Sequence, residues 1–456
     1  MTSPTLSFLG GAGTVTGSRF AVSTGESDVL VDAGLYQGLA ELRRRNWHPS
    51  DLDPAALDAV VLTHAHLDHC GYLPHLVREG FTGPIRCTPE TAELVEIVLR
   101  DSAHLQEEDA RLANERGYSK HRPALPLYDL GDVERTLPLL APVAYESRVD
   151  LAPDITGLLT PAGHILGSSC ALLDVAGHRI VFSGDLGRGN HPLIRPAGPR
   201  PAASTVVVES TYGDRHHEPA DPELLASAVR RTVARGGSVL IPAFAVDRTE
   251  LVLIELHRLM STGQIPRVRV HLDSPMALAA LAVYRRAFAG ARRSGPDLRT
   301  AIGELHLEAV ADAAASIRLN QPTEPCIIIS ASGMATGGRV VHHLAHQLPD
   351  PRNCVVLTGY QAVGTRGRQL LDGARELKIH GRYVPVRAEV VDVPTFSVHA
   401  DADELMAWLC SAPSAPDVVY VVHGEPQSSA ALARRIRTDL GWLAVVPRLD
   451  ERVRLD

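Results

Sequence analysis

Residues 58–77 read DAVVLTHAHLDHCGYLPHLV, in which an apolar strand runs into a polar loop and then into a helix. The loop, HAHLDH, places four ligand-type side chains in six positions, which disfavours a solvated loop with chance histidines. In extended chain, the i, i+2 spacing directs His64 and His66 to the same side. Asp68 and His69 then turn away, so one short loop could serve two metal centres. Imidazole and carboxylate ligands suit Zn²⁺, with Mn²⁺ or Fe²⁺ as substitutes.

Further ligand-type residues stand just beyond other apolar runs. His164 lies in PAGHILGSS, Asp185 in FSGDLG and His423 in VVHGE. Each is flanked by glycine, which lets the backbone pack close to an ion. Taken singly, each also fits a helix cap or a turn. Together with the HAHLDH loop, they supply the ligands that a two-metal hydrolase requires.

Length and composition narrow the class of protein. A chain of 456 residues suggests two or three structural units, and 45% hydrophobic with 21% charged residues excludes disorder and coiled coil. The net charge of -8 argues against indiscriminate binding of polyanions. The six cysteines form no CxxC pair, and the chain has neither a leader-like start nor an apolar run of about 18 residues. We therefore expect a cytoplasmic protein that does not contact a membrane.

The pattern of expected strands and helices changes along the chain. The first 60 residues read as short strands with Gly-rich turns, and a long helix follows over about 90–115. Residues 205–380 alternate apolar strands with amphipathic helices, which indicates a doubly wound parallel sheet. Residues 381–456 return to the short-strand pattern of the first 60 residues and end in a short strand pair. We therefore expect an α/β protein in which one domain, residues 1–204 and 381–456, is interrupted by a second.

The ligand pattern resembles the metallo-β-lactamase superfamily, an αββα sandwich with an HxHxDH motif followed by a later His and a later Asp. The resemblance implies that one zinc is held by His64, His66 and His164, the other by Asp68 and His69, with Asp185 bridging them. Asp32, in VDAGLYQG, matches the first motif of the superfamily, a carboxylate behind the histidines that orients them. A turn Asp before Gly is the alternative for Asp32.

Three further motifs resemble those of the β-CASP branch, which comprises nucleic-acid hydrolases with a second domain inserted before the last sheet strands. Glu209 in VVVESTYGDR, His399 in FSVHAD and His423 match them, and SASGMATGGR is characteristic of the inserted domain. In this branch, enzymes acting on RNA typically carry His at the third motif, whereas DNA-repair nucleases resembling Artemis carry an aliphatic residue. The resemblance therefore implies an RNA substrate.

The expected chemistry assigns catalytic roles to Asp68, Asp185, Glu209 and His399. Two metals activate water and stabilise the leaving oxygen. A leaving 3′-oxygen also gains from a proton donor, and His399 held by Glu209 is a general acid of that kind. The alternative is that Glu209 caps a loop and that His399 caps a helix at Ala400.

Two Gly-rich loops are expected to bind RNA phosphates. SASGMATGGR lies between a strand and a helix, where free N–H groups and the helix dipole attract anions, and GTRGR repeats this arrangement with two guanidinium groups. Gly-rich turns of this type are also common structural devices. The predicted substrate-binding residues are Ser332, Gly333, Arg339, Arg366 and Arg368 in these loops, together with Ser397 in FSVHAD.

The sequence as a whole predicts a zinc-dependent ribonuclease with two Zn²⁺ that cleaves single-stranded RNA, mainly endonucleolytically, to leave a 5′-phosphate and a 3′-hydroxyl. It looks most like the short relatives of the 3′-end cleavage subunit of the polyadenylation machinery. Only about 30 residues follow His423, too few for the C-terminal domain of ribonuclease J, and no N-terminal KH domain is expected.

Several alternatives stay open. A small-molecule esterase or thioesterase does not explain the insertion of roughly 175 residues. A non-catalytic RNA-binding subunit typically loses metal ligands, which are all in place here. A DNA nuclease of the same branch and a homodimeric state are further options.

Overall fold

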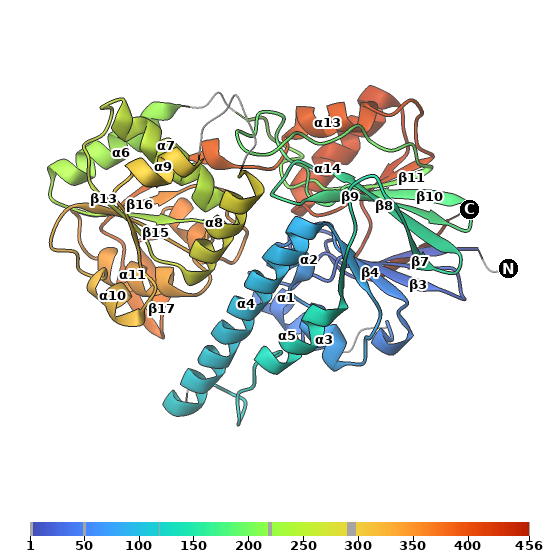
Figure 1. The fold of residues 1–456 in the computed structure, drawn as a ribbon, viewed down its shortest axis with the longest axis horizontal. Coiled ribbons are helices and arrows are strands. Elements are labelled where there is room, and N and C mark those ends of the chain that lie inside the picture. Colours follow the sequence, from blue (N-terminus) through green and yellow to red (C-terminus); the bar gives the residue numbers. More distant parts are fainter. Residues whose placement is uncertain (1–2, 49–51, 118, 218–220, 290–297, 456) are drawn as a thin grey trace. The chain divides into compact units, whose positions relative to one another are not determined.

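The computed structural model describes residues 3–48, 52–117, 119–217, 221–289 and 298–455. The chain forms two compact units, drawn in Figure 1: unit 1 is residues 1–216 with 398–456, and unit 2 is residues 217–397.

Unit 1 contains two seven-stranded sheets. The first has the order β22-β1-β2-β3-β4-β5-β6 and the second the order β21-β20-β11-β10-β9-β8-β7. The strands of the first sheet are β1 (Thr5–Phe8), β2 (Phe20–Ser23), β3 (Asp28–Val31), β4 (Ala59–Val61), β5 (Ile85–Cys87), β6 (Leu140–Pro142) and β22 (Glu451–Arg454). Those of the second are β7 (Arg148–Ala152), β8 (Ile155–Pro161), β9 (Ser169–Val175), β10 (His178–Phe182), β11 (Thr205–Val208), β20 (Val418–Val421) and β21 (Ala444–Val445).

The two sheets pack through their apolar faces, as the alternating burial of β8 and β9 requires. Phe20 of the first sheet contacts Phe182 of the second with 5.8 Å between ring centroids. The outer face of the second sheet is covered by two helices, which Figure 1 shows above it, with Leu405 and Leu432 in their shared core. The helices of unit 1 are α1 (Ala40–Arg45), α2 (Leu67–Cys70), α3 (Leu73–Arg78), α4 (Pro89–Arg116), α5 (Leu130–Thr136), α13 (Ala402–Cys410) and α14 (Pro426–Arg435).

Unit 2 is built on a six-stranded sheet of order β14-β13-β15-β12-β16-β19, with every pairing parallel. Its strands are β12 (Val239–Pro242), β13 (Arg269–Leu272), β14 (Leu307–Ala309), β15 (Cys326–Ser330), β16 (Cys354–Leu357) and β19 (Glu389–Asp392), and β17 (Glu376–Ile379) with β18 (Arg382–Pro385) forms a separate hairpin. The helices are α6 (Pro222–Ala234), α7 (Arg248–Ser261), α8 (Pro275–Ala287), α9 (Leu298–Glu304), α10 (Ala313–Arg318), α11 (Arg339–Gln347) and α12 (Arg366–Leu371).

The predicted α/β class, a sandwich domain interrupted by a second domain with a parallel sheet, is confirmed. The structure divides the chain at other residues than the expected 205 and 380. Strand β11 pairs with β10 and β20 inside unit 1, whereas β19 pairs with β16 inside unit 2. The predicted pairing of the last two strands is wrong, because β21 joins β20 and β22 joins β1. Among the described residues, no helix is both long and apolar enough to cross a bilayer.

Candidate metal centre

The ligand-type residues of unit 1 stand just beyond strand ends of both sheets. His64 follows β4 in the first sheet. In the second sheet, His164 follows β8, Asp185 follows β10 and His423 follows β20. Because these loops continue buried strands, the side chains two or three residues beyond the strand ends are held inside the protein. His64 and His164 are fully buried and Asp185 is 2% exposed.

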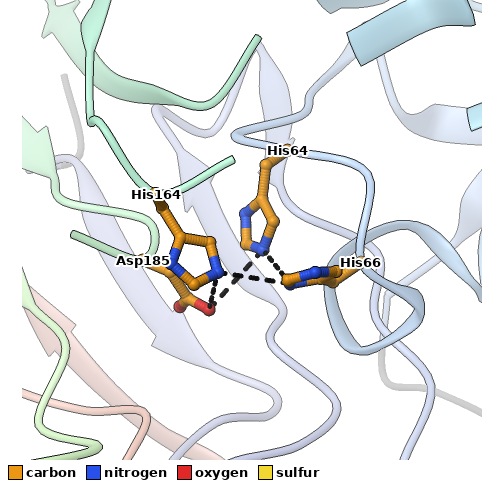
Figure 2. A group of neighbouring side chains, drawn as sticks. All are labelled: His64, His66, His164 and Asp185. Atoms are coloured by element: carbon orange, nitrogen blue, oxygen red, sulfur yellow. Dashed lines mark hydrogen bonds and ion pairs between the residues drawn. The ribbon is translucent and has the colours of Figure 1, made fainter. Parts of the chain in front are cut away.

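The first group comprises His64, His66, His164 and Asp185, and Figure 2 shows the three rings directed at one another and at the carboxylate. His66 Nδ1 lies 3.1 Å from His64 Nε2 and 3.3 Å from His164 Nε2. The same two Nε2 atoms each lie 3.5 Å from Asp185 Oδ2. The i, i+2 spacing thus places both loop histidines in one group, as predicted from the sequence.

The second group comprises Asp68, His69 and His423. His69 Nε2 lies 3.2 Å from His423 Nε2, and His423 Nε2 lies 3.5 Å from Asp68 Oδ2. His423 has φ +47°, a left-handed conformation that is strained for a residue with a side chain. The fold holds this strained residue where its ring faces the group.

Asp185 joins the two groups through its two oxygens. Oδ2 faces the rings of the first group, whereas Oδ1 lies 3.3 Å from His69 Nε2 and 3.4 Å from His423 Nδ1. A carboxylate with one oxygen directed at each group is the geometry of a bridging ligand.

The charge states of the three rings in the first group suit cation binding. Burial lowers the pKa of His66 to about 4 and holds the pKa values of His64 and His164 well below the ordinary value, so these rings are neutral and their nitrogen lone pairs could bind a metal ion. Burial acts in the same direction on His69, but the carboxylates of Asp185 and Asp32 outweigh it and raise its pKa. A donor set of imidazoles and carboxylates with this burial fits a divalent metal ion such as zinc.

Asp32 supports the second group from behind, through His69. Its Oδ2 lies 2.7 Å from His69 Nδ1, so His69 Nε2 is left facing the ligand group. Both carboxylate oxygens also accept hydrogen bonds from Thr63 Oγ1, at 3.0 and 2.9 Å, and Oδ1 accepts one from the Thr63 backbone N–H. Thr63 Oγ1 further lies 3.0 Å from His64 Nδ1, so one hydroxyl contacts both Asp32, which supports the second group, and a histidine of the first group.

Arg19 is a buried guanidinium that holds the chain around Asp32. Its carbon lies 3.6 Å from the ring centroid of Tyr72 and 5.2 Å from that of Tyr36. Its Nε donates to the Gly34 carbonyl at 2.8 Å. A side chain at Gly34 would have its Cβ 1.7 Å from the Asp68 carbonyl oxygen, so only glycine fits where this segment meets the ligand loop.

Glu209 and His399 lie beside the first group. His399 Nδ1 is 3.4 Å from Glu209 Oε1 and 3.9 Å from Asp185 Oδ2, and its ring centroid is 4.4 Å from that of His164. Glu209 is fully buried and accepts the backbone N–H of Leu186 at 2.6 Å. Glu209 also lies within ligand reach of Asp185 and His423.

The local structure around His399 differs from the alternative in which His399 caps a helix at Ala400. A 3₁₀ turn (Pro394–Phe396) precedes His399, and the N-cap of α13 is Asp401, whose carboxylate accepts the N–H groups of Asp403 and Glu404. His399 itself forms an isolated antiparallel bridge with Gly187. This bridge fixes the His399 backbone against the loop that carries Asp185.

Sequence comparisons identify the family. Profiles match at residues 14–235 for the metallo-beta-lactamase superfamily, 249–370 for the Beta-Casp domain and 383–447 for the Zn-dependent metallo-hydrolase RNA specificity domain. Ribonuclease TTHA0252 of Thermus thermophilus is 36% identical over 434 residues, which cover 93% of this chain and 94% of that protein. The chain belongs to the β-CASP family of the metallo-β-lactamase superfamily.

Other β-CASP relatives cover the chain as fully. The transcription termination factor FttA of Methanosarcina mazei is 34% identical over 94% of this chain and 68% of that protein. An RNase J-like protein of Methanocaldococcus jannaschii is 31% identical over 97% of both chains. A solved Enterococcus faecalis protein of unknown function covers the whole chain with a TM-score of 0.52 and 14% identity, which supports the fold alone.

In the β-CASP domain, two predicted RNA-binding arginines hold the Gly-rich loop itself. Arg339 donates to Asp273 Oδ1 at 2.6 Å and to the carbonyls of Val310 and Ala311, both at 2.9 Å. Arg366 donates to the Ala335 and Thr336 carbonyls, at 3.2 and 3.0 Å. Both side chains therefore stabilise the loop, and their contact with RNA stays a prediction.

The other predicted substrate residues have different surroundings. Ser332 Oγ lies 2.9 Å from the Thr336 hydroxyl, and Gly333 packs so close to Phe244 that a Cβ would lie 2.6 Å from the ring. Arg368 Nε pairs with Asp372. Ser397 is buried, and no hydrogen bond is present at its Oγ within the part of the chain that the structure describes. RNA binding by these residues likewise stays a prediction.

Sequence reasoning missed Thr63 and Arg19. A threonine just after a strand and a lone arginine just before one carry no signal that distinguishes them from ordinary residues. Their roles depend on contacts with Asp32 and Gly34, which lie 31 and 15 residues away in the sequence.

The supporting role of Asp32 can be tested by measuring the zinc affinity of variants of this β-CASP protein. We expect Asp32→Asn to lower zinc affinity about 10- to 100-fold, the usual cost of removing a carboxylate that orients a ligand histidine. Chelator competition measures it. Thr63→Ser, which keeps the hydroxyl, is the matched control and should stay close to wild type. Unchanged zinc affinity in Asp32→Asn would contradict the orienting role.

Proposed function

We propose that this chain is a zinc-dependent ribonuclease that hydrolyses phosphodiester bonds of single-stranded RNA, mainly endonucleolytically, with two Zn²⁺ per chain. The observation that carries the proposal is the pair of ligand groups that share Asp185, with Glu209 and His399 beside one of them. The relatives named a ribonuclease and an RNase J-like protein, and the profile named for RNA specificity, support RNA as the substrate.

The proposed chemistry divides between metal and protein. Bound metal ions activate water and neutralise charge on the phosphate. The carboxylates of Asp185 and Asp68 contact the histidines of the ligand groups and hold them in place. Asp32 fixes the His69 tautomer. His399, oriented through Nδ1 by Glu209, donates a proton to the leaving 3′-oxygen. This leaves a 5′-phosphate and a 3′-hydroxyl.

The metal in the proposal is zinc because imidazole dominates the donor set. Five of the seven proposed ligands are histidines, and the other two are Asp68 and Asp185. Such borderline nitrogen ligands favour zinc over the oxygen-seeking Mg²⁺, with Mn²⁺ or Fe²⁺ as substitutes.

A cytoplasmic location is part of the proposal, supported by six free cysteines, five of them buried. A homodimer is the alternative to a monomer, and light scattering of the purified protein distinguishes the two.

Competition between matched RNA and single-stranded DNA oligonucleotides tests the substrate. We expect RNA cleavage to exceed DNA cleavage at least about tenfold, a modest 1.4 kcal/mol of discrimination. Salt must be fixed, because phosphate contacts make affinity salt-dependent. A circular RNA in the same assay separates endonuclease from exonuclease action. Equal rates on RNA and DNA would favour a DNA-acting or unselective nuclease, whereas activity on esters alone would favour the small-molecule hydrolase.

A further inference from the structure

A basic and aromatic surface lies on unit 1, at and just after α1, which Figure 1 draws in the blue part of the ribbon. Arg43, Arg44 and Trp47 are all exposed. Trp47 has 55% of its surface exposed, against 7% for Trp408, and Trp442 is only half-buried. An indole left in solvent on a folded domain has no role in the core.

The three side chains lie at the C-terminal end of α1 and in the turn that follows it. In that turn, Trp47 N–H donates to the Arg44 carbonyl at 3.0 Å. Trp47 follows Arg43 by four residues and Arg44 by three, so it lies about one turn further along the chain than either arginine. Arg45 pairs with Asp450 at 2.7 Å, whereas among the described residues no carboxylate pairs with Arg43 or Arg44.

This surface is anchored to the chain segment that supports the ligands. Asn46, which precedes Trp47, is 7% exposed. Its carboxamide accepts from Tyr36 N–H at 3.0 Å and Arg19 Nη2 at 3.1 Å, and donates to the Tyr36 carbonyl at 2.9 Å. Trp47 is thus one residue from a buried, fully bonded anchor and does not lie on a loose loop.

The anchored segment is in turn bonded to the ligand loop. Ala33 N–H donates to the His69 carbonyl at 2.7 Å, and Leu35 N–H donates to the Leu67 carbonyl at 2.8 Å. Arg19 stacks on Tyr72, three residues after His69, while bonding Asn46. A ligand held at Trp47 is therefore connected through two short backbone segments to the loop that carries Asp68 and His69.

We propose that Arg43, Arg44 and Trp47 bind the single-stranded RNA substrate outside the metal centre, with the indole stacked on a base and the two guanidinium groups on flanking phosphates. An aromatic platform beside unpaired arginines is the usual means of holding single-stranded nucleic acid without reading its sequence. The proposal rests on the ribonuclease function proposed above. It adds a binding site on unit 1 to the loops predicted in the β-CASP domain.

The test compares two substrates that differ in length. An RNA of about 20 nucleotides extends beyond the metal centre. In contrast, bis(4-nitrophenyl) phosphate is a diester too small to contact Arg43, Arg44 and Trp47 together, so its hydrolysis reports on the metal centre. We expect Trp47→Ala to raise KM for the RNA about fivefold or more, the lower end for loss of one stacked base. Its hydrolysis of the small diester and its zinc content should stay at wild-type values. Trp47→Phe, which keeps a stacking ring, should recover most of the loss.

Arg43→Ala/Arg44→Ala gives an independent readout. We expect the slope of log affinity for RNA against log salt to flatten by about 1.4, because each phosphate contact on a single strand contributes about 0.7. Matched controls are Leu443→Ala, an apolar residue of unit 1 that is 58% exposed, and Arg434→Ala, an exposed arginine on α14. Both controls should behave as wild type.

Each outcome is decisive. If Trp47→Ala cleaves RNA like Leu443→Ala, the proposal is wrong while the ribonuclease function stands. If Trp47→Ala loses zinc or small-diester activity, Trp47 acts structurally and the proposal also fails. A change in oligomeric state with Trp47→Ala would show that the surface binds a second copy of the chain. If the wild type hydrolyses the small diester but no RNA, the proposed function itself has failed.

Discussion

Asp185→Asn is expected to lower RNA cleavage by at least about 10³-fold and to reduce bound zinc from two ions per chain to one or none. The aspartate directs Oδ2 at His64 and His164 and Oδ1 at His69 and His423. Asparagine keeps one oxygen and replaces the other by a hydrogen-bond donor, so one group loses its ligand outright. Losing metal stabilisation of several kcal/mol removes three or more powers of ten in rate.

His423→Ala is the matched comparison for Asp185→Asn. His423 belongs to the group with Asp68 and His69, so its loss should weaken chiefly that ion and leave about one zinc per chain. Elemental analysis after zinc reconstitution measures both variants. A wild type that never exceeds one zinc, or an Asp185→Asn protein that keeps two, would overturn the bridging role.

His399→Ala is expected to lose at least about 10²-fold in cleavage rate while keeping its zinc. The reason is that His399 is directed through Nδ1 at Glu209, 3.4 Å away, and lies outside both ligand groups, so its removal takes away a proposed proton donor but no proposed ligand. General acids of this kind contribute about 10²- to 10⁴-fold. Single-turnover cleavage with parallel metal analysis separates the two roles. Loss of zinc, or near-normal cleavage with zinc intact, would contradict the assignment.

Glu209→Gln extends this prediction. If Glu209 orients His399, the double variant should lose much less than the product of the two single losses. Glu209 also lies within ligand reach of Asp185 and His423, so metal analysis of Glu209→Gln is essential. Reduced zinc in Glu209→Gln alone would identify this residue as a ligand instead of a positioning residue.

The sequence was sufficient to predict the fold class and to predict that the proposed ligand residues lie close together. His64 and His66 share a group, as their i, i+2 spacing predicts, and His164, Asp185 and His423 each stand just beyond an apolar run that does form a strand. Parallel strands of continuous apolar residues likewise produced the predicted sheet of unit 2.

The sequence was insufficient where the outcome depends on long-range packing. The strand β11 reads like its apolar successors in unit 2, and only its pairing with β10 and β20 assigns it to unit 1. The pairing of Arg339 with Asp273, 66 residues away, could not be predicted from the Gly-rich loop beside it. Thr63 is part of the site only because Asp32 lies across from it.

The pairing of β11 with β20 also implies that the candidate metal centre is completed late in synthesis. These neighbouring strands are separated in the chain by all of unit 2, which is continuous in sequence and can fold during synthesis before β20 is made. A nascent chain that has passed Asp185 already carries six of the seven proposed ligands, but His399 and His423 are translated last. A ribosome-bound intermediate therefore has an incomplete centre, and its own messenger RNA is not exposed to the finished nuclease until synthesis is almost over.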